Sequence, residues 1–376
     1  MDYKRKIQEN IEKYLFKKRV IIIYGARQTG KTTLVKSILK KFSHKKTLYL
    51  DGEDPANIEN LSNSNLESLK NLYTEIELLV IDEAQKINNI GRTLKLFTDH
   101  LPQLQVIATG SSSFELSNKI IEPLTGRKFE FYLYPIALNE TIAANSRAKI
   151  NLKIDEYLLY GMYPEVLNTK GELKKKILQE LTGSYLFKDI FVFENIKNPE
   201  LLRKLLQLIA LQIGSEVSLH ELATNLGVDK KTIDRYLDLL EKAYVIFRLP
   251  ALSKNSRKEI VKKKKIYFYD LGIRNTLIQN YNPLNLRIDI GGIWENFCIA
   301  ERWKFLSNLD KDFKMYFWRN YAGQEINLIE EKESFFNALE FKFKEKKIKL
   351  PKKIQENYQI KNFSLIHRKN WWKLLS

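Results

Sequence analysis

The sequence predicts an α/β fold with a parallel sheet in its N-terminal part, followed by a mostly helical part and an α+β part. Short apolar runs alternate with helical stretches between residues 20 and 136, which is typical of strands and helices wound around a parallel sheet. After about residue 150 the pattern becomes mostly helical, and from about residue 290 a helix leads into further strands. We therefore expect three domains, at residues 1–150, 151–282 and 283–376.

The individual elements follow from the spacing of apolar residues. Ile7, Ile11, Tyr14 and Leu15 form one helical stripe, which predicts a helix within residues 3–18. The expected strands of the N-terminal part are 20–24, 46–52, 77–83, 104–110 and 128–136, with helices from Lys31 onward and at 90–98. Further along we expect helices in 151–210, a break at 160–166, a helix at 293–305, and strands around KMYFWRN, EINLIEE and FFNALEFKF.

Composition narrows the class of protein. The chain has 376 residues, of which 44% are hydrophobic, enough for the cores of several domains. Cys298 is its single cysteine, which excludes an internal disulfide and a thiolate metal cluster. The N-terminus MDYKRKIQEN lacks an apolar signal core, and no apolar run reaches the length of a membrane span. We expect a cytoplasmic protein that does not cross a membrane.

The charge is strongly positive and unevenly spread. The formal net charge is +18, and residues 341–376 hold eleven Lys or Arg against two Glu, which places +9 in this tail. Nucleic acid, an acidic protein partner or an anionic surface would each suit this excess. A genome that favours Lys codons would produce the same composition, so the partner stays open at this point.

The segment GARQTGKTT fits the phosphate-binding pattern G-x-x-x-x-G-K-[ST], and it lies between an apolar strand and a helix. In such a loop the backbone N–H groups surround a phosphate, Lys31 reaches the β and γ oxygens, and Thr32 offers a hydroxyl to Mg²⁺. A Gly-containing turn with an unrelated Lys is the alternative, but strand, loop and helix follow in the required order. The expected ATP-binding residues are Gly25, Ala26, Arg27, Gln28, Thr29, Gly30, Lys31, Thr32 and Thr33.

A second acidic motif completes this candidate site. The strand-like run LLVI ends in Asp82 and Glu83. Asp82 at a strand end would hold Mg²⁺, and Glu83 would polarise the attacking water. Either acid alone would also fit a solvated strand end. Together with Lys31 they predict hydrolysis of a nucleoside triphosphate.

Further polar residues near this site have two interpretations each. Ser111, or Thr109, would contact the γ-phosphate or the water, whereas Ser111 would equally serve as a helix N-cap before Phe114. Arg127 would supply positive charge to the transition state, within this chain or in a neighbouring subunit of a homo-oligomer, or it is a surface residue beside a turn. Arg27 would touch phosphate or fold over the outside of the loop.

At this point the chain resembles a bacterial and archaeal family of AAA-type ATPases that carry a C-terminal domain of unknown function. The residues behind the resemblance are GARQTGKTT, LLVIDEAQK, ATGSSS, LTGRKFEF, YGMYPEVL, TIDRYLDLLEKAYVIFRL, KKIYFYDLGIRN, GIWENFCIAE and ALEFKF. It implies an ATPase core, a helical lid with a winged helix, and a C-terminal domain resembling restriction endonucleases. Ala26 departs from the Pro that is common in the family, and Asn327 departs from an Asp.

Residues 218–249 read as helix, turn and helix, with Gly227 in the turn and Asp229 as the cap of the second helix. The outward side of that helix and the segment after it are basic, as in a winged helix that contacts DNA. A lid or docking surface is the alternative, because Asp234 and Asp238 interrupt the basic face. The candidate nucleic-acid residues are Lys230, Lys231, Arg235, Arg257, Lys258, Lys262, Lys263, Lys264 and Lys265.

By resemblance, Glu295, Asn327, Glu340 and Lys342 occupy the positions of a nuclease metal site. Glu340 and Lys342 are two residues apart on a predicted strand and therefore share a face. An ordinary half-exposed strand would show the same alternation. Asn327 lacks the negative charge that Mg²⁺ prefers, so we expect a nuclease-like domain that does not cut.

These observations predict an Mg²⁺-dependent ATPase whose C-terminal half binds a partner, which is DNA, RNA or another protein. Two alternatives remain at the level of sequence. One is a switch that binds ATP with negligible turnover, and the other is an ATP-coupled nuclease. Glu83 opposes the first alternative, and Asn327 opposes the second.

Overall fold

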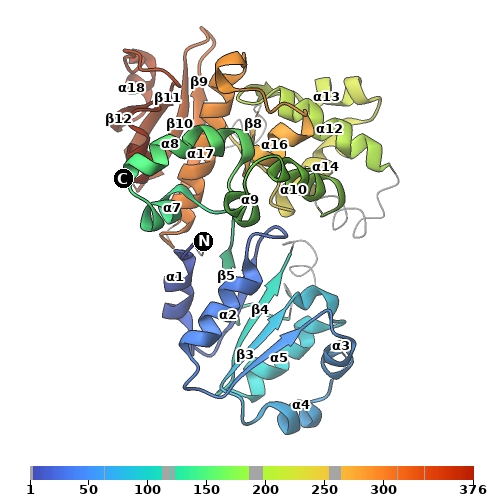
Figure 1. The fold of residues 1–376 in the computed structure, drawn as a ribbon. Coiled ribbons are helices and arrows are strands. Elements are labelled where there is room, and N and C mark those ends of the chain that lie inside the picture. The colour runs from blue at the N-terminus through green and yellow to red at the C-terminus, as the bar shows by residue number, and fades with distance from the viewer. Residues whose placement is uncertain are drawn as a thin grey trace.

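Figure 1 shows the fold of the chain in a computed structural model. The N-terminal sheet forms the lower half in this view, and the middle and C-terminal parts form the upper half. The structure describes residues 3–62, 64–111, 120, 123–185, 198–253, 264–310, 312–333 and 335–376.

The N-terminal part is a five-stranded parallel sheet with the order β2-β3-β4-β1-β5. The three central strands are buried along their whole length, as expected for a parallel sheet that is covered on both faces. This confirms the predicted parallel α/β core. The strands are β1 (Val20–Tyr24), β2 (Thr47–Asp51), β3 (Leu78–Asp82), β4 (Gln105–Gly110) and β5 (Lys128–Tyr132).

Helices cover both faces of this sheet. Helices α1 (Ile7–Tyr14) and α2 (Lys31–Lys41) pack on one face, and α3 (Pro55–Leu61), α4 (Leu66–Tyr73) and α5 (Ile90–His100) pack on the other. A single 3₁₀ turn, η1 (Ala84–Lys86), follows β3. Helix α1 is shorter than the predicted range because Leu15 is extended and both Phe16 and Lys18 have positive φ, at 59° and 57°.

The middle part contains helices around a small antiparallel sheet with the order β6-β8-β7. Helix α13 ends at Gly227, which has a φ of 66°, and the Asp229 side chain accepts a hydrogen bond from Thr232 N at the start of α14. The predicted helix–turn–helix is therefore present. Between residues 138 and 282 the helices are α7 (Leu138–Ala144), α8 (Arg147–Tyr160), α9 (Pro164–Asn168), α10 (Leu173–Glu180), the π-helical turn η2 (Leu181–Tyr185), α12 (Pro199–Leu211), α13 (Leu219–Leu226), α14 (Lys230–Lys242) and α16 (Leu271–Leu277). The strands of the small sheet are β6 (Glu216–Val217), β7 (Ile246–Leu249) and β8 (Lys264–Phe268).

The C-terminal part packs α17 (Ile290–Ser307) against a four-stranded sheet with the order β12-β11-β10-β9. Strands β9, β10 and β11 are antiparallel, and β12 runs parallel to β11. The strands are β9 (Lys314–Arg319), β10 (Glu325–Lys332), β11 (Phe335–Phe341) and β12 (Ile360–Ile366), and the short helices are η3 (Leu284–Leu286), α18 (Lys352–Asn357) and η4 (Trp371–Leu375).

One apolar core runs through all three parts of the chain. Tyr134 stacks on Tyr269 with ring centroids 4.8 Å apart, and Phe247 lies 4.9 Å from the ring of Trp303. The Trp303 indole also donates a hydrogen bond to the Tyr134 hydroxyl at 3.1 Å. The segment that follows β5 is thus packed against the end of β8 and against α17. Within the part of the chain that the structure describes, no helix combines the length and apolar character that a bilayer crossing requires.

Candidate functional site

The phosphate loop connects the carboxyl end of β1 to the start of α2. The local backbone geometry requires glycine at two of its positions. A Cβ atom on Gly25 would lie 2.2 Å from the carbonyl oxygen of Leu133, which leaves no room for a side chain. Gly30 has a φ of 95°, in the left-handed region that other residues rarely adopt. The Thr29 hydroxyl donates to the Ala26 carbonyl at 2.8 Å and closes the turn from inside.

Lys31 is the first residue of α2, and its ammonium folds back into the loop. Its Nζ donates to the carbonyl oxygens of Gly25 at 2.9 Å and Ala26 at 3.1 Å, and it lies 3.9 Å from Glu83 Oε1. The side chain is 4% exposed. The loop therefore holds a positive charge at the place where phosphate oxygens would enter it.

Thr32 and Asp82 bring two oxygen ligands together across the sheet edge. The Thr32 hydroxyl donates to Asp82 Oδ2 at 2.6 Å, and the Tyr49 hydroxyl donates to the same oxygen at 2.8 Å. Burial, followed by the hydrogen bond to Asp82, raises the pKa of Tyr49, so this phenol stays a donor. Thr109 donates to the other carboxylate oxygen. A hydroxyl next to a carboxylate is a donor set that suits Mg²⁺, which keeps several waters as further ligands.

Glu83 follows Asp82 in a left-handed conformation with a φ of 49°. Its backbone N–H donates to the Thr109 hydroxyl at 3.1 Å, which helps to hold this uncommon conformation. Its Oε2 accepts a hydrogen bond from Gln85 Nε2 at 2.6 Å, and the same Nε2 donates to the Ser111 hydroxyl at 3.0 Å. Gln85 therefore connects two residues that sequence reasoning placed at the site separately. The predicted capping role of Ser111 concerns Phe114, which lies outside the described residues.

These groups open into a cavity of about 570 Å³ at the carboxyl edge of the sheet. Arg27 lines this cavity. The far wall is formed by Pro164 and Glu165 of α9, so the segment YGMYPEV of the middle part faces the phosphate loop. The cavity is lined by Arg27, Gln28, Gly30, Lys31, Thr32, Thr33, Lys36, Tyr49, Asp51, Glu53, Asp82, Glu83, Pro164 and Glu165.

Arg5 supports the loop from behind, and sequence reasoning did not find it. Its guanidinium donates to the carbonyl oxygens of Thr29 and Tyr134, both at 2.6 Å, and to Glu140 Oε1 at 3.1 Å. Arg5 is 8% exposed, and Glu140 is fully buried. A single Arg in a charged N-terminal segment carries no local signal of such a role, because all three partners are distant in sequence.

Arg127 does not lie at the phosphate loop, which corrects the expectation of a role within its own chain. It directly precedes β5, whose first residue, Lys128, pairs with Val20 at the start of β1. The phosphate loop follows the other end of β1, roughly 15 Å away along the strand. Arg127 instead pairs with Asp99 at 2.7 Å. A role in a neighbouring subunit stays a prediction.

The candidate nucleic-acid residues lie in different surroundings. Lys230, Lys231 and Arg235 are exposed on α14, and the half-buried Lys264 begins β8. Lys265 is 1% exposed and paired with carboxylates, which corrects its expected place on an open basic face. Arg257, Lys258, Lys262 and Lys263 lie outside the described residues.

The acidic residues of α14 all pair with one residue of β7. Arg248 forms ion pairs with Asp234, Asp238 and Glu241, the first at 3.1 Å. The two aspartates that sequence reasoning set against a basic face of α14 therefore share one cation with Glu241, which offsets one of these three negative charges.

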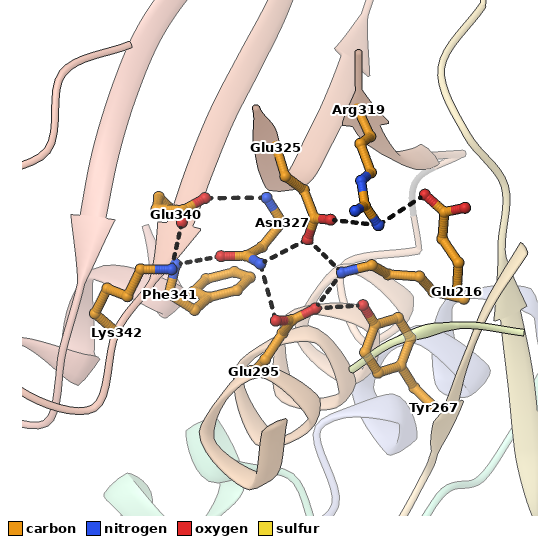
Figure 2. A network of polar contacts seen from close by, with 10 residues as sticks. Glu216, Tyr267, Glu295, Arg319, Glu325, Asn327, Glu340, Phe341 and Lys342 are labelled. Atoms are coloured by element: carbon orange, nitrogen blue, oxygen red, sulfur yellow. Dashed lines mark hydrogen bonds and ion pairs between the residues drawn. The ribbon is translucent and has the colours of Figure 1, made fainter. Parts of the chain in front are cut away.

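The structure brings together the four residues of the expected nuclease-like cluster, Glu295, Asn327, Glu340 and Lys342 (Figure 2). Asn327 Nδ2 donates to Glu295 Oε2 at 2.9 Å, and Asn327 N donates to Glu340 Oε2 at 3.1 Å. Lys342 pairs with Glu340 at 2.6 Å, although burial still raises the pKa of Glu340 above its ordinary value. Among the described residues, no group of three or more His, Cys, Asp or Glu side chains is arranged to hold a metal ion.

Comparison with known families divides the chain into three matched regions. Residues 17–142 match a family described as "AAA domain". Residues 151–284 match a "Domain of unknown function (DUF8612)", and residues 290–370 match a "Domain of unknown function (DUF4143)". The two later matches assign no activity to these regions.

Individual relatives are similar in sequence to most of the chain. An uncharacterised protein of Methanocaldococcus jannaschii is 25% identical over 287 residues, which cover 70% of this chain but 63% of that protein. An uncharacterised protein of Mycobacterium tuberculosis is 26% identical over 332 residues, covering 87% of this chain and 71% of that protein. The chain thus aligns with less than two thirds of the length of the first of these proteins.

Among solved structures, the chain is similar to the Walker-type ATPase of Pyrococcus abyssi, with a TM-score of 0.52 and 16% sequence identity. The similarity covers 74% of this chain and 96% of that one. At this identity the likeness concerns the fold alone. The family match and the fold together support a P-loop ATPase of the AAA type for the N-terminal part of this chain.

Proposed function

We propose that the chain is an Mg²⁺-dependent ATPase that couples hydrolysis to binding of a partner through its middle and C-terminal parts. One observation carries the enzymatic half of this proposal. The Thr32 hydroxyl meets Asp82 at 2.6 Å beside a buried Lys31, and Glu83 stands next to them at the mouth of one cavity. A phosphate cradle, a metal-ligand pair and a candidate base thereby share one space.

Each residue of this site has a specific role in the proposal. Backbone N–H groups of the loop and Lys31 bind the phosphates, and Thr32 with Asp82 provides ligands for Mg²⁺. When bound there, the ion would supply positive charge that offsets the negative charge of the phosphates. Glu83 orients a water for attack on the γ-phosphorus and accepts its proton, while ADP leaves with the electrons of the broken bond.

Two substitutions test the ATPase proposal. Lys31→Ala should weaken ATP binding and abolish hydrolysis, because the loop loses its charge on the β and γ oxygens. Glu83→Gln should bind ATP like the parent and lose about 10²–10⁴-fold in turnover, since Gln cannot accept the proton. Binding is measured by calorimetry and turnover by phosphate release. Hydrolysis by Glu83→Gln at the parent rate would remove Glu83 from the mechanism.

The alternative of a switch without turnover is decided by the same assay. The parent would then bind ATP but release no phosphate, either alone or with duplex DNA, single-stranded DNA or RNA. Stimulation by one nucleic acid would also identify the partner class.

Nucleic acid is the partner that the middle part favours. The element order α12, β6, α13, α14, β7, β8 and the sheet order β6-β8-β7 support a winged helix, with α14 as the helix that would enter a groove. The exposed cations Lys230, Lys231 and Arg235 support a basic contact surface on that helix, and Arg248 offsets part of its negative charge. Such contacts favour binding to the phosphate backbone with little sequence preference.

Charge reversal tests this surface. Lys230→Glu/Lys231→Glu should weaken binding to DNA or RNA and reduce the log–log salt slope by roughly one unit for each phosphate that the protein no longer neutralises. Lys70→Glu/Lys95→Glu is the matched control, because it removes the same charge from exposed positions on α4 and α5. Equal weakening by both variants would point to net charge alone. No binding by the parent at low salt would leave the basic surface to a protein partner.

A further inference from the structure

The cluster of carboxylates in the C-terminal part has a feature that a metal site would not have. Glu295 projects from α17, Glu325 and Asn327 from β10, and Glu340 from β11 (Figure 2). In a metal site the facing atoms of such a cluster would all be acceptors, because a cation would sit among them. Here the groups that face the carboxylates are donors from the protein itself.

Asn327 is the first of these donors, and its orientation is fixed. Its Oδ1 accepts a hydrogen bond from Phe341 N at 2.9 Å, so Nδ2 must point toward the carboxylates. Nδ2 lies 2.9 Å from Glu295 Oε2 and 3.4 Å from Glu325 Oε1. An amide therefore presents N–H groups at the place where a metal ligand would present a lone pair. An Asp at this position would instead face two carboxylates with an oxygen.

Lys265 is the second donor and supplies the positive charge. Its Nζ lies 2.8 Å from Glu295 Oε1 and 2.5 Å from Glu325 Oε1, and its side chain is 1% exposed. Burial by itself lowers the pKa of Lys265, but attraction to the two carboxylates outweighs burial and raises it, so the group stays charged. The Tyr267 hydroxyl donates to the same Glu295 oxygen at 2.7 Å. Lys265 and Tyr267 are two residues apart on β8 and share a face of that strand.

Nearby contacts hold β8 and its sheet in place. Leu252 N donates to the Phe317 carbonyl at 2.7 Å, and Phe317 N donates to the Pro250 carbonyl at 3.0 Å. Arg319 pairs with Glu216 of β6 at 3.2 Å. The middle part is thus bonded to β9 beside the cluster, where the Lys265 side chain is buried. A divalent ion between Glu295 and Glu325 would lie against its ammonium.

We propose that the Lys265 ammonium is the permanent cation of this cluster. The C-terminal part then binds no divalent metal there, and the cluster instead connects α17 and β10 to β8. This inference does not depend on the ATPase proposal. It explains why Asn327 is the fitting residue, since an amide donor complements two carboxylates that share one internal cation. It also predicts that restoring the carboxylate alone does not restore a metal site.

The test uses the full chain without nucleotide, with Mn²⁺ as the probe and calorimetry as the readout. Neither the parent nor Asn327→Asp should have an Mn²⁺ site in the cluster. Adding Glu295→Gln to either protein should therefore leave its Mn²⁺ binding unchanged. Lys265→Met/Asn327→Asp removes the ammonium and adds a carboxylate. It should bind about one Mn²⁺ per chain more than the parent binds, because the carboxylates of the cluster then have no internal cation between them. Adding Glu295→Gln to this double variant should abolish the new site, which assigns it to the cluster rather than to the phosphate loop.

Three results would overturn the inference. One is Mn²⁺ binding by the parent that Glu295→Gln abolishes, because a metal would then displace the ammonium. Another is binding by Asn327→Asp alone that equals binding by the double variant. The third is a double variant with the circular dichroism and ATP affinity of the parent that gains no Mn²⁺. If the double variant does not fold, the parent, Asn327→Asp and Glu295→Gln decide: binding that depends on Glu295 refutes the inference, and its absence supports it.

Discussion

Replacing Arg5 by Met should both destabilise the protein and disturb its phosphate loop. The change leaves Glu140 buried without its cationic partner, and breaking a buried ion pair in this way typically costs about 3–5 kcal/mol. Glu140 keeps two backbone donors, Lys6 N and Ala137 N, both at 2.9 Å, which places the expected cost toward the lower end of that range. The Thr29 and Tyr134 carbonyls also each lose a charged donor, which adds to the loss. We therefore expect a loss of about 3–5 kcal/mol in the free energy of unfolding.

Urea denaturation followed by circular dichroism measures this loss, with the denaturant slope as a check that the native state stays comparable. Glu140→Gln added to Arg5→Met removes both charges and should recover about 1–2 kcal/mol, within the range of coupling between contacting residues. ATP affinity should fall in Arg5→Met, because the Thr29 carbonyl inside the loop is no longer held. Two strictly additive substitutions, or a loss below about 1 kcal/mol in Arg5→Met, would show that the ion pair does not support the loop.

Two further predictions concern catalysis and acid stability. Gln85→Leu should lower turnover by up to about 100-fold with unchanged ATP affinity, because Gln85 holds Glu83 beside Ser111. Equal rates of phosphate release by Gln85→Leu and the parent would contradict this role. Burial alone would raise the pKa of Asp289, but hydrogen bonds from two arginines outweigh it and hold the pKa at about 2. Because this pKa lies below its unfolded value, the parent loses stability as the pH falls from about 4 to about 2. Asp289→Asn should remove this acid-dependent part of the free energy of unfolding, which is about 1–2 kcal/mol because Asp289 is partly exposed. Urea denaturation of both proteins at several pH values across this range measures the difference.

The parts of the site that follow from local sequence were predictable, and the parts built by distant contacts were not. An apolar run that ends in Asp82 and Glu83 specifies a buried strand with acids at its carboxyl edge, and parallel pairing brings that edge to the phosphate loop. Arg5 and Gln85 acquire their roles only from partners that other elements supply. No spacing in the sequence marks such partners.

Two expectations failed for reasons that strand geometry explains. Arg127 precedes its strand, and residues before a parallel strand lie at the edge opposite to a loop that follows one. The predicted strand at 128–136 already places Arg127 before its first residue. Lys265 belongs to a run of four lysines that suggests an exposed arm, but the run enters β8, where alternate side chains point inward. Which of them is buried depends on the carboxylates of α17 and β10.

The shared apolar core has a consequence for how this chain can be divided or recombined. Tyr134 and Trp303 belong to regions that match separate families, yet they touch each other and the aromatic residues of the middle sheet. A recombinant fragment ending at residue 150 would expose the Tyr134 face to water, and its complement would expose Tyr269 and Trp303. Neither fragment would keep the surface of a self-contained module. A homologous region exchanged into this chain would have to bring a matching aromatic face, so the three regions are constrained to change together.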